Sequence, residues 1–445
     1  MKVAVENTST LGRKLTVSIP TADLEPKITE RLKEVSRTVR LPGFRPGKVP
    51  ANLVKSRFGP SIRAEVCEKE LQPSYAKALE QENLRPAGMP EINPVTMEEG
   101  KDFEYTAEFE VYPEFEVQGI DKLKVERATA EISDADLEDM LGKLQQQHTE
   151  WKDVEREAAA GDRVKVDFEG KTRKSEDNDG TFPGNTATDA QFVIGKGSMP
   201  DEFEESFTEA LIGAKAGDEV KAKVKFPKGY RTEEVANKTA TYTITVKAVE
   251  EGVEPAIDDE FATKLGIEEG GADKLREELK GNMERELDAT IKAKVKEQVV
   301  EGLTAANEVD VPGALVTQEI GRLREEAKQR AAQYGQGNVD LPDDIFPDEM
   351  FAEQARQRVH VGLVFGEIIR ANDLTADEAK VEEALDAMVA QYGEQGDAFK
   401  QYYRSNQQAM AGIESSVLED QVVELVLSKA KVTDKASTFA ELTGA

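Results

Sequence analysis

Several residue types that carry chemistry are scarce in this chain of 445 residues. Cys67 is the only cysteine, so no intramolecular disulfide can form, and a single thiol suits a reducing compartment. His148 and His360 are the only histidines, and they lie far apart in sequence. They form no Cys/His spacing typical of zinc and no Ser-His or Cys-His arrangement for nucleophilic catalysis. We therefore expect no metal, no cofactor and no covalent catalysis.

Long apolar runs are also missing. No uninterrupted run approaches the ~20 residues of a membrane-spanning helix, and the first six residues lack the apolar core of a signal peptide. The sequence therefore predicts a cytoplasmic protein with no membrane partner. The phosphate-binding pattern Gly-x-x-x-x-Gly-Lys-Ser/Thr is absent as well, which argues against a cycle driven by nucleotide hydrolysis.

Positive charge is short overall and concentrated in one stretch. The chain has 58 Lys and Arg against 88 Asp and Glu, a net charge of −30. Residues 1–112 contain 17 basic and 17 acidic side chains, so residues 113–445 carry the whole negative excess. Residues 35–63 contain no acid, and their seven basic residues are Arg37, Arg40, Arg45, Lys48, Lys55, Arg57 and Arg63. Because the acidic body repels RNA, any contact with nucleic acid is expected at this basic island.

The centre of the basic island reads Leu-Pro-Gly-Phe-Arg-Pro-Gly-Lys-Val-Pro, residues 41–50. Three prolines and two glycines in ten residues exclude both a helix and a central strand. An exposed loop presents its side chains, here Phe44, Arg45 and Lys48. An aromatic ring between cations suits stacking and phosphate contact on a surface of RNA and protein. The alternative is a solvated face whose acids lie elsewhere.

The run from Gly43 to Pro50 resembles the ribosome-docking signature of the trigger factor family, chaperones that meet nascent chains at the ribosomal exit tunnel. The resemblance extends over nearly the entire chain. It implies six ribosome-binding residues, which are Gly43, Phe44, Arg45, Gly47, Lys48 and Pro50. The partners it implies are protein and rRNA of the large ribosomal subunit near the tunnel exit, and nascent or unfolded polypeptides. It also allows a homodimer when the protein is off the ribosome.

The first part of the chain predicts a small α+β domain, residues 1–112. Apolar residues alternate over 15–19 and again over 103–111, as half-buried strands require, and a helical stripe covers 24–39. Short helices are expected over 51–57 and 61–79. Residues 113–149 are expected to be a linker, with a helix opened by Ser133 or Asp134 that packs on the helical body because its apolar stripe is too narrow to form a core.

Residues 150–249 predict a domain of short antiparallel strands. Alternation recurs over 164–168, 220–226 and 240–248, with turn signals between these segments and one helical piece over 203–212. The spacing of several motifs resembles the FKBP-type peptidyl-prolyl isomerase domain. These motifs are Asp167-Phe168-Glu169-Gly170, Phe182, Phe192-Val193-Ile194-Gly195-Lys196-Gly197, Ala214-Lys215-Ala216-Gly217-Asp218-Glu219 and Phe226-Pro227-Lys228-Gly229-Tyr230.

That resemblance implies an apolar pocket for a prolyl ring. Carried over by position, its catalytic residues are Phe168, Phe182, Phe192, Met199, Phe203, Phe207, Tyr230 and Tyr242. Met199-Pro200-Asp201-Glu202-Phe203 departs from the family's Met-Ile-Pro-Gly-Phe, and about four extra residues precede Gly213, so either Phe203 or Phe207 could form the pocket floor. Pro183 stands where the family often has an acid. Ordinary core packing is the alternative for each aromatic taken singly.

Helical periodicity takes over in residues 250–432. Apolar residues recur every four positions from Leu275 to Leu303, so on a helix of 3.6 residues per turn the stripe winds around the axis and must meet different neighbours. A Gly- and Pro-rich tip at 333–347 and a second tip at 393–397, followed by Phe399, Tyr402 and Tyr403, resemble the tips of the arms of the trigger factor body. Residues 433–445 are expected to be a polar tail.

Together these patterns predict an α+β multidomain protein: an N-terminal α+β ribosome-docking domain, an antiparallel-β FKBP-type domain and an all-α C-terminal chaperone body with helical arms. The expected function is an ATP-independent chaperone that isomerises X-Pro bonds. Two alternatives stay open at this point. One is a holding chaperone with a degraded prolyl pocket, and the other is a free prolyl isomerase without ribosome docking.

Overall fold

The computed structural model describes residues 1–39, 44, 50–173, 180–230, 232, 235–267, 269–334, 345–390 and 392–444. Its contacts divide the chain into two compact units. The first comprises Met1–Arg127 and Lys292–Lys435, and the second comprises Ala128–Ile291 and Ala436–Ala445. One division falls inside the long helix α6 (Gly271–Ala306), so each unit contains part of that helix. Each unit is thus built from stretches that are far apart in sequence.

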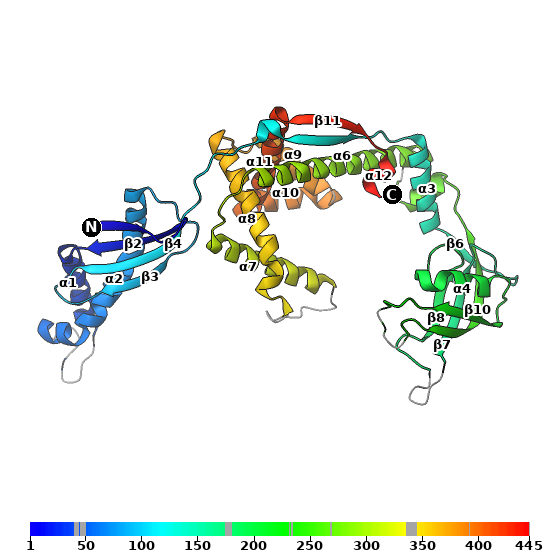
Figure 1. Ribbon diagram of the computed structural model, residues 1–445, viewed down its shortest axis with the longest axis horizontal. Coiled ribbons are helices and arrows are strands. Elements are labelled where there is room, and N and C mark those ends of the chain that lie inside the picture. Colours follow the sequence, from blue (N-terminus) through cyan, green and yellow to red (C-terminus); the bar gives the residue numbers. More distant parts are fainter. Residues whose placement is uncertain are drawn as a thin grey trace. The chain divides into compact units, whose positions relative to one another are not determined.

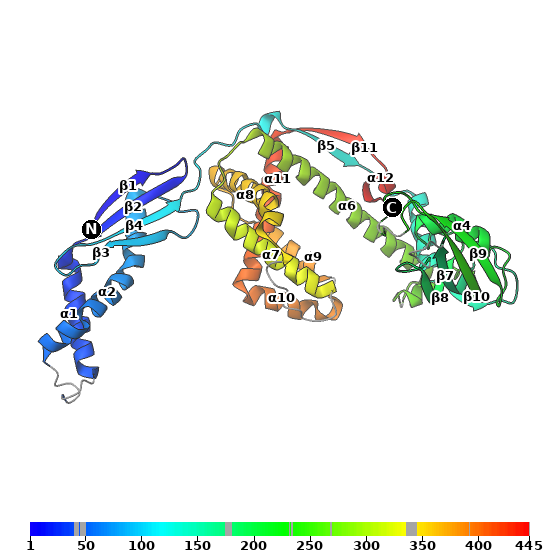
Figure 2. The same ribbon diagram turned by 60° about the horizontal axis from the view of Figure 1, so that its bottom comes forward.

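The first unit begins with an antiparallel sheet in the strand order β1-β2-β4-β3 (Figure 1). Its elements are β1 (Lys2–Asn7), β2 (Gly12–Ile19), α1 (Thr21–Thr38), α2 (Ala51–Glu82), β3 (Glu91–Thr96) and β4 (Phe103–Glu110). The predicted alternation is confirmed, because the inward residues of β2 and β4 are buried, Leu15 and Tyr105 completely. Helices α1 and α2 lie side by side and bury Ile28 and Cys67 in the same core (Figure 2).

Helix α2 corrects the expectation of two short helices. It is continuous over 32 residues although Pro60 and Pro73 lie inside it. Each proline removes one backbone donor from the helix. Beside Pro73, the Ser74 hydroxyl donates to the carbonyl oxygen of Glu70 at 2.6 Å, and the helix buries apolar side chains along the sheet on both sides of that turn. Tertiary packing therefore outweighs the local preference of proline.

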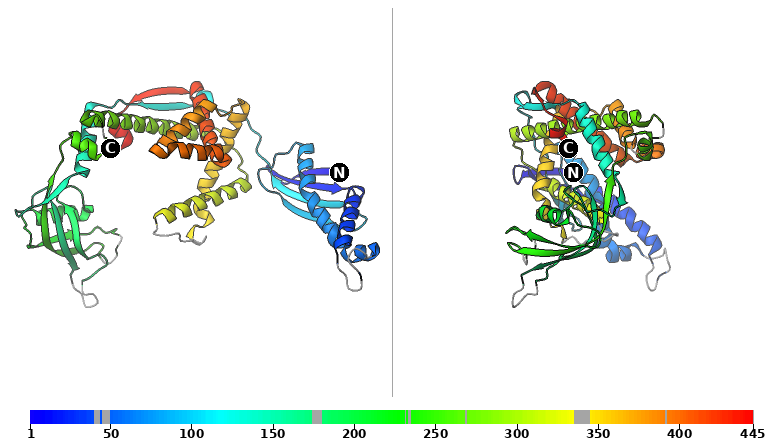
Figure 3. Two further views of the ribbon diagram at one scale, coloured as in Figure 1. Left: turned by 180° about the vertical axis from the view of Figure 1, so that it is seen from behind. Right: turned by 90° about the vertical axis from the view of Figure 1, so that its right-hand side faces the viewer.

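Most of the remainder of the first unit is helical. Its helices after α6 are α7 (Gly313–Tyr334), α8 (Asp348–Ala371), α9 (Glu378–Ala390), α10 (Gly396–Ser405) and α11 (Gln407–Lys429), with the short 3-10 helix η3 (Gly393–Gln395). A second short 3-10 helix, η1 (Ile120–Lys122), lies before β5 (Lys124–Thr129). Helices α7 and α8 pack through Leu323, Phe351 and Ala355. Helices α9 and α11, orange to red in Figure 3, share a core around Leu385 and Ile413.

The winding stripe of α6 is confirmed. Leu275 packs in a cluster with Leu141 and Phe261, whereas Met283 and Leu287 pack in another cluster that contains Phe439. Successive stretches of the helix therefore meet different partners, as the repeat of four predicts.

The second unit contains a five-stranded antiparallel sheet (Figure 1). Its elements are β6 (Glu150–Asp153), β7 (Arg163–Thr172), β8 (Thr186–Val193), α4 (Asp201–Leu211), β9 (Glu219–Lys225) and β10 (Thr239–Val253). The order is β6-β10-β7-β8, with β9 also paired to β10. The long strand β10 therefore organises the sheet, and the strands predicted over 164–168, 220–226 and 240–248 are confirmed.

Helix α3 (Asp134–Gln147) belongs to the same unit and confirms the predicted helix of the linker. Ser133 caps it, and Asp136 completes a reciprocal capping box. Its Leu141 is fully buried against the short helix α5 (Asp259–Lys264) and the first part of α6. The strand-like part of the linker is β5 (Lys124–Thr129).

The polar tail expected at 433–445 was a wrong prediction. Strand β11 (Lys431–Ala436) pairs with β5, and helix α12 (Phe439–Thr443) follows, opened by a capping box between Thr438 and Glu441. Phe439 is only 3% exposed and packs on Met283 and Leu287. The pairing of β11 with β5 and the burial of Phe439, with Leu442 packed beside it, hold this segment on the rest of the chain.

None of the helices within the described ranges combines the length and apolarity that a bilayer crossing needs. Over the same ranges, no group of three or more His, Cys, Asp or Glu side chains is arranged to hold a metal ion.

Candidate functional site

The eight residues predicted to form the prolyl pocket come together in one apolar cluster of the second unit. They are supplied by β7, β8, β10, α4 and the loops that follow β7, β8 and β9. Phe182, Met199, Phe207 and Tyr242 are buried, and Phe168, Phe192, Phe203 and Tyr230 are partly buried against them. Residues up to 74 positions apart in sequence are thus gathered in one cluster between the sheet and α4.

Four buried rings form the base of this cluster, and we call Phe182, Phe207, Phe226 and Tyr242 the ring floor. Tyr242 is central, with its ring centroid 5.5 Å from that of Phe207 and 6.4 Å from that of Phe182. Both pairs meet edge to face, the arrangement that the charge distribution of aromatic rings favours. Phe207 is 1% exposed and Phe203 is partly buried, so Phe207 is the more enclosed of the two candidates for the pocket floor.

Gly170 on β7 makes room for Tyr242. A Cβ atom at position 170 would lie 2.4 Å from Cε1 of the Tyr242 ring, far inside van der Waals contact. The motif Asp167-Phe168-Glu169-Gly170 thus supplies one ring of the cluster and the space for another. Burial raises the pKa of the Tyr242 phenol above its usual value, so the hydroxyl stays neutral at physiological pH.

Phe226 is the ring that sequence reasoning missed as a site residue. It is 2% exposed, and its centroid lies 4.7 Å from that of Tyr230 and 5.8 Å from that of Phe203. It ends the alternating segment 220–226 and opens the motif Phe226-Pro227-Lys228-Gly229-Tyr230. A ring four residues before a predicted site tyrosine, at the inward end of a strand, was the available signal.

The partly buried rings complete the cluster, and we call Phe168, Phe192, Phe203 and Tyr230 the upper rings. Phe168 contacts Phe207 and Tyr242 with centroid distances of 5.8 and 5.7 Å. Its neighbour in sequence, Asp167, faces the other way and binds Lys247 at 2.7 Å, and this hydrogen bond lowers the pKa of the carboxyl group. Strand alternation therefore keeps charge off the apolar face. The cluster offers aromatic surface without an acid or base among its members.

The predicted docking stretch lies on the hairpin of α1 and α2. Phe44 is 42% exposed, and Pro50 stands directly before α2 as its N-cap residue. Gly43, Arg45, Gly47 and Lys48 lie outside the described residues. The described part of the stretch is consistent with an outward aromatic side chain.

The basic island is smaller than its seven residues imply, because two of them are paired with acids from elsewhere in the first unit. Lys55 binds Glu99 at 2.8 Å. Arg63 is buried, lies 3.3 Å from Glu25 and donates to the carbonyl oxygens of Met97 and Lys101 at 2.9 and 2.8 Å. Arg63 therefore joins the loop between β3 and β4 to the helices and is unavailable to a partner.

Of the four cations of the island that the structure describes, Arg37 and Arg57 are exposed and stay outside these pairs. Arg37 lies in the last turn of α1, and Arg57 lies two turns into α2. Neither has an ion-pair partner among the described residues. These two arginines flank the predicted loop, whose own charges are Arg45 and Lys48.

Comparison with known proteins covers both regions. Residues 1–144 match the family model described as bacterial trigger factor protein, residues 271–428 match the model of the trigger factor C-terminus, and residues 154–247 match FKBP-type peptidyl-prolyl cis-trans isomerase. A trigger factor of Alkalilimnicola ehrlichii is 45% identical over 442 residues, which is 99% of this chain and 95% of the relative. The chain belongs to the trigger factor family.

Other members of the trigger factor family are similarly close. Trigger factors of Pseudoalteromonas atlantica and Marinobacter nauticus are each 43% identical over 99% of this chain and over 99% and 98% of their own lengths. A solved structure of the trigger factor chaperone is 20% identical in sequence. The match covers 96% of this chain and 99% of the chain in that structure, with a TM-score of 0.48. The family models and the full-length relatives confirm the family recognised from the docking signature and the FKBP-type motifs.

The third surface of interest is the tip of α9 and α10 in the trigger factor body. Met388, Tyr392 and Tyr402 are exposed there, Tyr402 by 57%. Tyr392 stacks on Phe399 with a centroid distance of 4.0 Å, so the tip is braced from within. In the other predicted tip, Ile345 is exposed. Adaptable apolar side chains at helix ends suit weak contact with varied partners.

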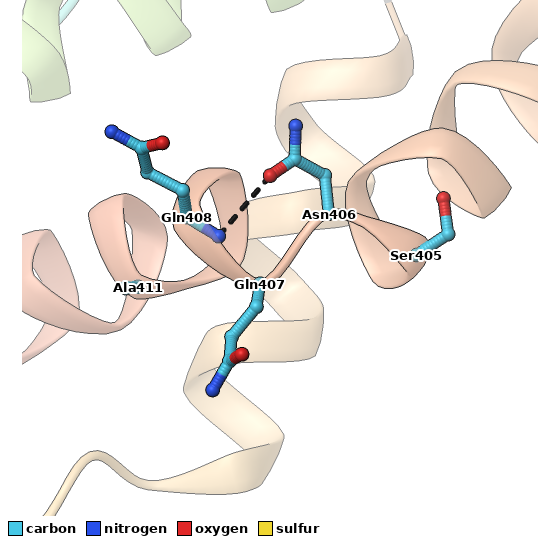
Figure 4. A pocket seen from close by; sticks show the side chains of 5 residues that line it. All are labelled: Ser405, Asn406, Gln407, Gln408 and Ala411. Carbon is cyan, nitrogen blue, oxygen red and sulfur yellow. Dashed lines mark hydrogen bonds between the residues drawn. The ribbon is translucent and has the colours of Figure 1, made fainter. Parts of the chain in front are cut away.

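A shallow hollow of about 620 Å³ lies beside this tip, between α10 and α11 (Figure 4). It is lined by Ser405, Asn406, Gln407, Gln408 and Ala411. Asn406 accepts a hydrogen bond from the backbone N–H of Gln408 at 3.1 Å and so caps α11, while the side chains of Gln407 and Gln408 point to opposite sides (Figure 4). The hollow offers amide and hydroxyl groups but no titratable side chain.

Proposed function

We propose that this member of the trigger factor family is an ATP-independent, ribosome-associated chaperone that binds nascent or unfolded polypeptides, keeps them from aggregating and accelerates cis/trans isomerisation of their X-Pro bonds. The observation that carries the proposal is the gathering of all eight predicted site residues in one aromatic cluster, within a chain that belongs to this family along its length. We place the protein in the cytoplasm, where nascent chains are made.

The isomerase step requires no proton transfer. Resonance holds a peptide bond planar with a barrier of ~18–20 kcal/mol, and water around the polar amide favours that resonance. Aromatic rings such as Tyr242, Phe207 and Phe168 would receive the prolyl ring and strip water from the adjoining amide. Desolvation raises the free energy of the planar ground state relative to the twisted transition state. The absence of an acid or base within the cluster fits this chemistry.

Ribosome docking is proposed for the end of the α1–α2 hairpin. Phe44, Arg45 and Lys48 would contact protein and rRNA of the large subunit near the tunnel exit, with Arg37 and Arg57 adding attraction to phosphate. The exposed ring of Phe44 and the two outward arginines support this assignment. The large negative excess elsewhere in the chain would keep the rest of the molecule from binding RNA nonspecifically.

Client binding is proposed for the exposed apolar side chains at the arm tips, among them Tyr402, Met388 and Ile345. Isolated apolar residues of this kind bind weakly and with little selectivity, which suits a chaperone that must release its clients without nucleotide hydrolysis. A homodimer off the ribosome would cover the same surfaces.

Co-sedimentation with ribosomes tests the docking proposal. We expect the triple variant Phe44→Ala/Arg45→Ala/Lys48→Ala to stay in the supernatant under conditions in which the wild type pellets, and we expect wild-type pelleting to weaken as salt rises. The matched control is Lys77→Ala, an exposed lysine far along α2 without an ion-pair partner among the described residues. Equal pelleting of wild type and triple variant would leave a free prolyl isomerase as the better description.

A short prolyl peptide tests the isomerase proposal, because uncatalysed isomerisation takes tens to hundreds of seconds. We expect the full chain to accelerate the exchange seen by NMR, and Phe168→Ala or Tyr230→Ala to reduce that acceleration. Tyr402→Ala, at the arm tip, is the control and should leave it unchanged. No acceleration by the wild type would instead identify a holding chaperone with a non-catalytic prolyl site.

A further inference from the structure

Helix α4 begins at Asp201, nearly two turns before its floor residue Phe207. Phe203 and Phe207 lie four residues apart and therefore on the same face of the helix. Phe207 is buried in the ring floor, and Phe203 is partly buried above it.

The Phe203 ring touches three of the four floor rings. Its centroid lies 5.5 Å from that of Phe207, 5.8 Å from that of Phe226 and 5.4 Å from that of Tyr242. Carbon atoms in contact are about 3.5–4.0 Å apart, so a ring inserted between two others needs about 7–8 Å between them. A prolyl ring therefore does not fit between Phe203 and the floor in this arrangement.

We propose that Phe203 is a built-in cover of the prolyl site, whose ring must turn aside before a prolyl side chain can reach Phe207, Phe226 and Tyr242. This inference rests on the proposed isomerase function. Only the fraction of molecules with the ring turned aside binds substrate, so the cover raises the apparent dissociation constant for prolyl segments by the inverse of that fraction.

The moving part is the side chain and not the helix. Pro200 precedes α4 as its N-cap residue. The Glu204 carboxylate accepts hydrogen bonds from the backbone N–H groups of Gly197 and Met199 at 3.1 and 3.3 Å, which fixes the loop to the first turn. With the backbone held on both sides, rotation about the side-chain bonds of Phe203 is the simplest way to uncover the floor.

Phe168 also contacts the floor, through Phe207 and Tyr242, whereas Phe203 contacts Phe226 as well. It lies inside β7, where its backbone is paired on one side with Ile244 of β10 and on the other with Ala187 of β8. Its ring forms the side of the site that β7 supplies. Phe203 lies in the first turn of a helix whose remaining length holds the floor residue in place.

Peptide titration of the full chain tests the cover. The probe is the blocked tetrapeptide Ala-Leu-Pro-Phe, with binding and cis/trans exchange both followed by NMR. We expect Phe203→Ala to lower the apparent dissociation constant about tenfold, which corresponds to about 1.4 kcal/mol, and Phe203→Leu to lower it by less. Glu205→Ala, an exposed residue of the same helix, is the control and should match the wild type.

Folding of each variant is checked by urea unfolding followed through Trp151, the only tryptophan, which lies on β6 of this unit. An unchanged or higher dissociation constant in folded Phe203→Ala and Phe203→Leu would overturn the cover. If the variants bind more tightly and no form accelerates exchange, the cover stands and the isomerase function fails. If the wild type accelerates exchange and the variants bind less tightly, the isomerase function stands and Phe203 is an ordinary wall.

Discussion

The ring cluster and the basic island show two different ways of building a contact surface. The cluster gathers rings from distant parts of the sequence and depends on burial, so its members stabilise the fold and the site together. The island is local in sequence, lies at the end of a helical hairpin and depends on charge, so its outward members add little to stability. Lys55 and Arg63 are paired with acids of the first unit, whereas Arg37 and Arg57 are exposed. Cations that are close in sequence therefore differ in whether they are available to a partner. Burial fixes the positions of the rings in the cluster, whereas the exposed side chains of the island have no packing that fixes them. The positions of the ring residues are therefore easier to predict from the sequence.

Removal of a floor ring should give the largest effect of all. Tyr242→Ala leaves a cavity in the centre of the cluster, and we expect the second unit to lose about 3–5 kcal/mol of unfolding free energy. Urea unfolding followed by Trp151 fluorescence reports on this unit, since Trp151 lies on β6, paired with β10. Tyr402→Ala removes an exposed ring and should leave the transition in place. A loss below 1 kcal/mol for Tyr242→Ala would contradict the assignment of a floor.

Addition of one methyl group should destabilise the ring floor by overpacking, the opposite of the cavity left by Tyr242→Ala. In Gly170→Ala the new Cβ would overlap the Tyr242 ring, and we expect a loss of about 1–3 kcal/mol in the same unfolding transition. Gly142→Ala is the matched control, because position 142 in α3 has no atom within 4 Å of the added group. There the better helix propensity of alanine should stabilise by up to about 1 kcal/mol. Equal effects at both positions would show that the close approach at Gly170 is absent.

Changes in the basic island should alter the salt dependence of ribosome binding and leave the free energy of unfolding nearly unchanged. We expect Arg57→Gln to weaken ribosome binding and to reduce the slope of log affinity against log salt by about one, the amount for one phosphate contact. Lys55→Gln, two residues away, should change the slope less because Lys55 is already paired with Glu99. Neither change should move the unfolding of the first unit by more than about 0.5 kcal/mol. Identical slopes for both variants would refute the division between outward and paired cations.

Acid should loosen the arm before it affects the cluster. Hydrogen bonds from Arg404 and Lys400 lower the pKa of Glu382 to about 2, against about 4.3 for a free glutamate. The lowered pKa means that the stabilisation is fully present above the unfolded-state value and is lost as pH falls towards 2. Amide exchange of α9 and α10 should therefore be faster in Glu382→Gln than in the wild type at pH 6, with the difference shrinking below pH 4. Glu383→Gln, the exposed neighbour, should behave as the wild type.

The isomerase reaction should show no pH effect between pH 6 and 9. Burial raises the pKa of Tyr242 above its usual value, and the other residues of the ring floor are phenylalanines. Catalysis by desolvation therefore has no protonation step to lose. The measurement is the rate of exchange of the prolyl peptide across this range, and a bell-shaped profile would point to a general acid or base outside the cluster.

The sequence predicted most of this organisation because its strongest signals are local. Alternation at β2, β4, β7 and β10 and the repeat of four in α6 follow from burial on one face, which a single segment records. The family resemblance supplied the site residues, and the structure brought all eight of the cluster together. The six of the docking stretch stay a prediction.

The misses share one physical cause, because each depended on contacts between distant segments. Proline inside α2 gave a correct local signal that packing on the sheet overrode. The last segment of the chain packs through Phe439 on residues of α3 and α6. No local pattern in the sequence indicates that contact. Phe203 and Phe207 lie on the same face of α4 and differ in how deeply their rings are buried. That difference depends on how α4 packs on the sheet, which the spacing of residues in the sequence does not show.

The place of β10 in the sheet has a consequence for the biogenesis of the protein itself. β10 pairs with β6, β7 and β9. Before β10 is synthesised, β7 and β8 are therefore the only strands of this sheet that can form their native pairing. Translation delivers β6 first and β10 last, and at 5–20 residues per second the stretch from Glu150 to Val253 takes about 5–20 s. For that time its rings stand open to solvent on a growing chain. During its own synthesis this chain therefore exposes the kind of apolar surface that makes unfolded polypeptides aggregate.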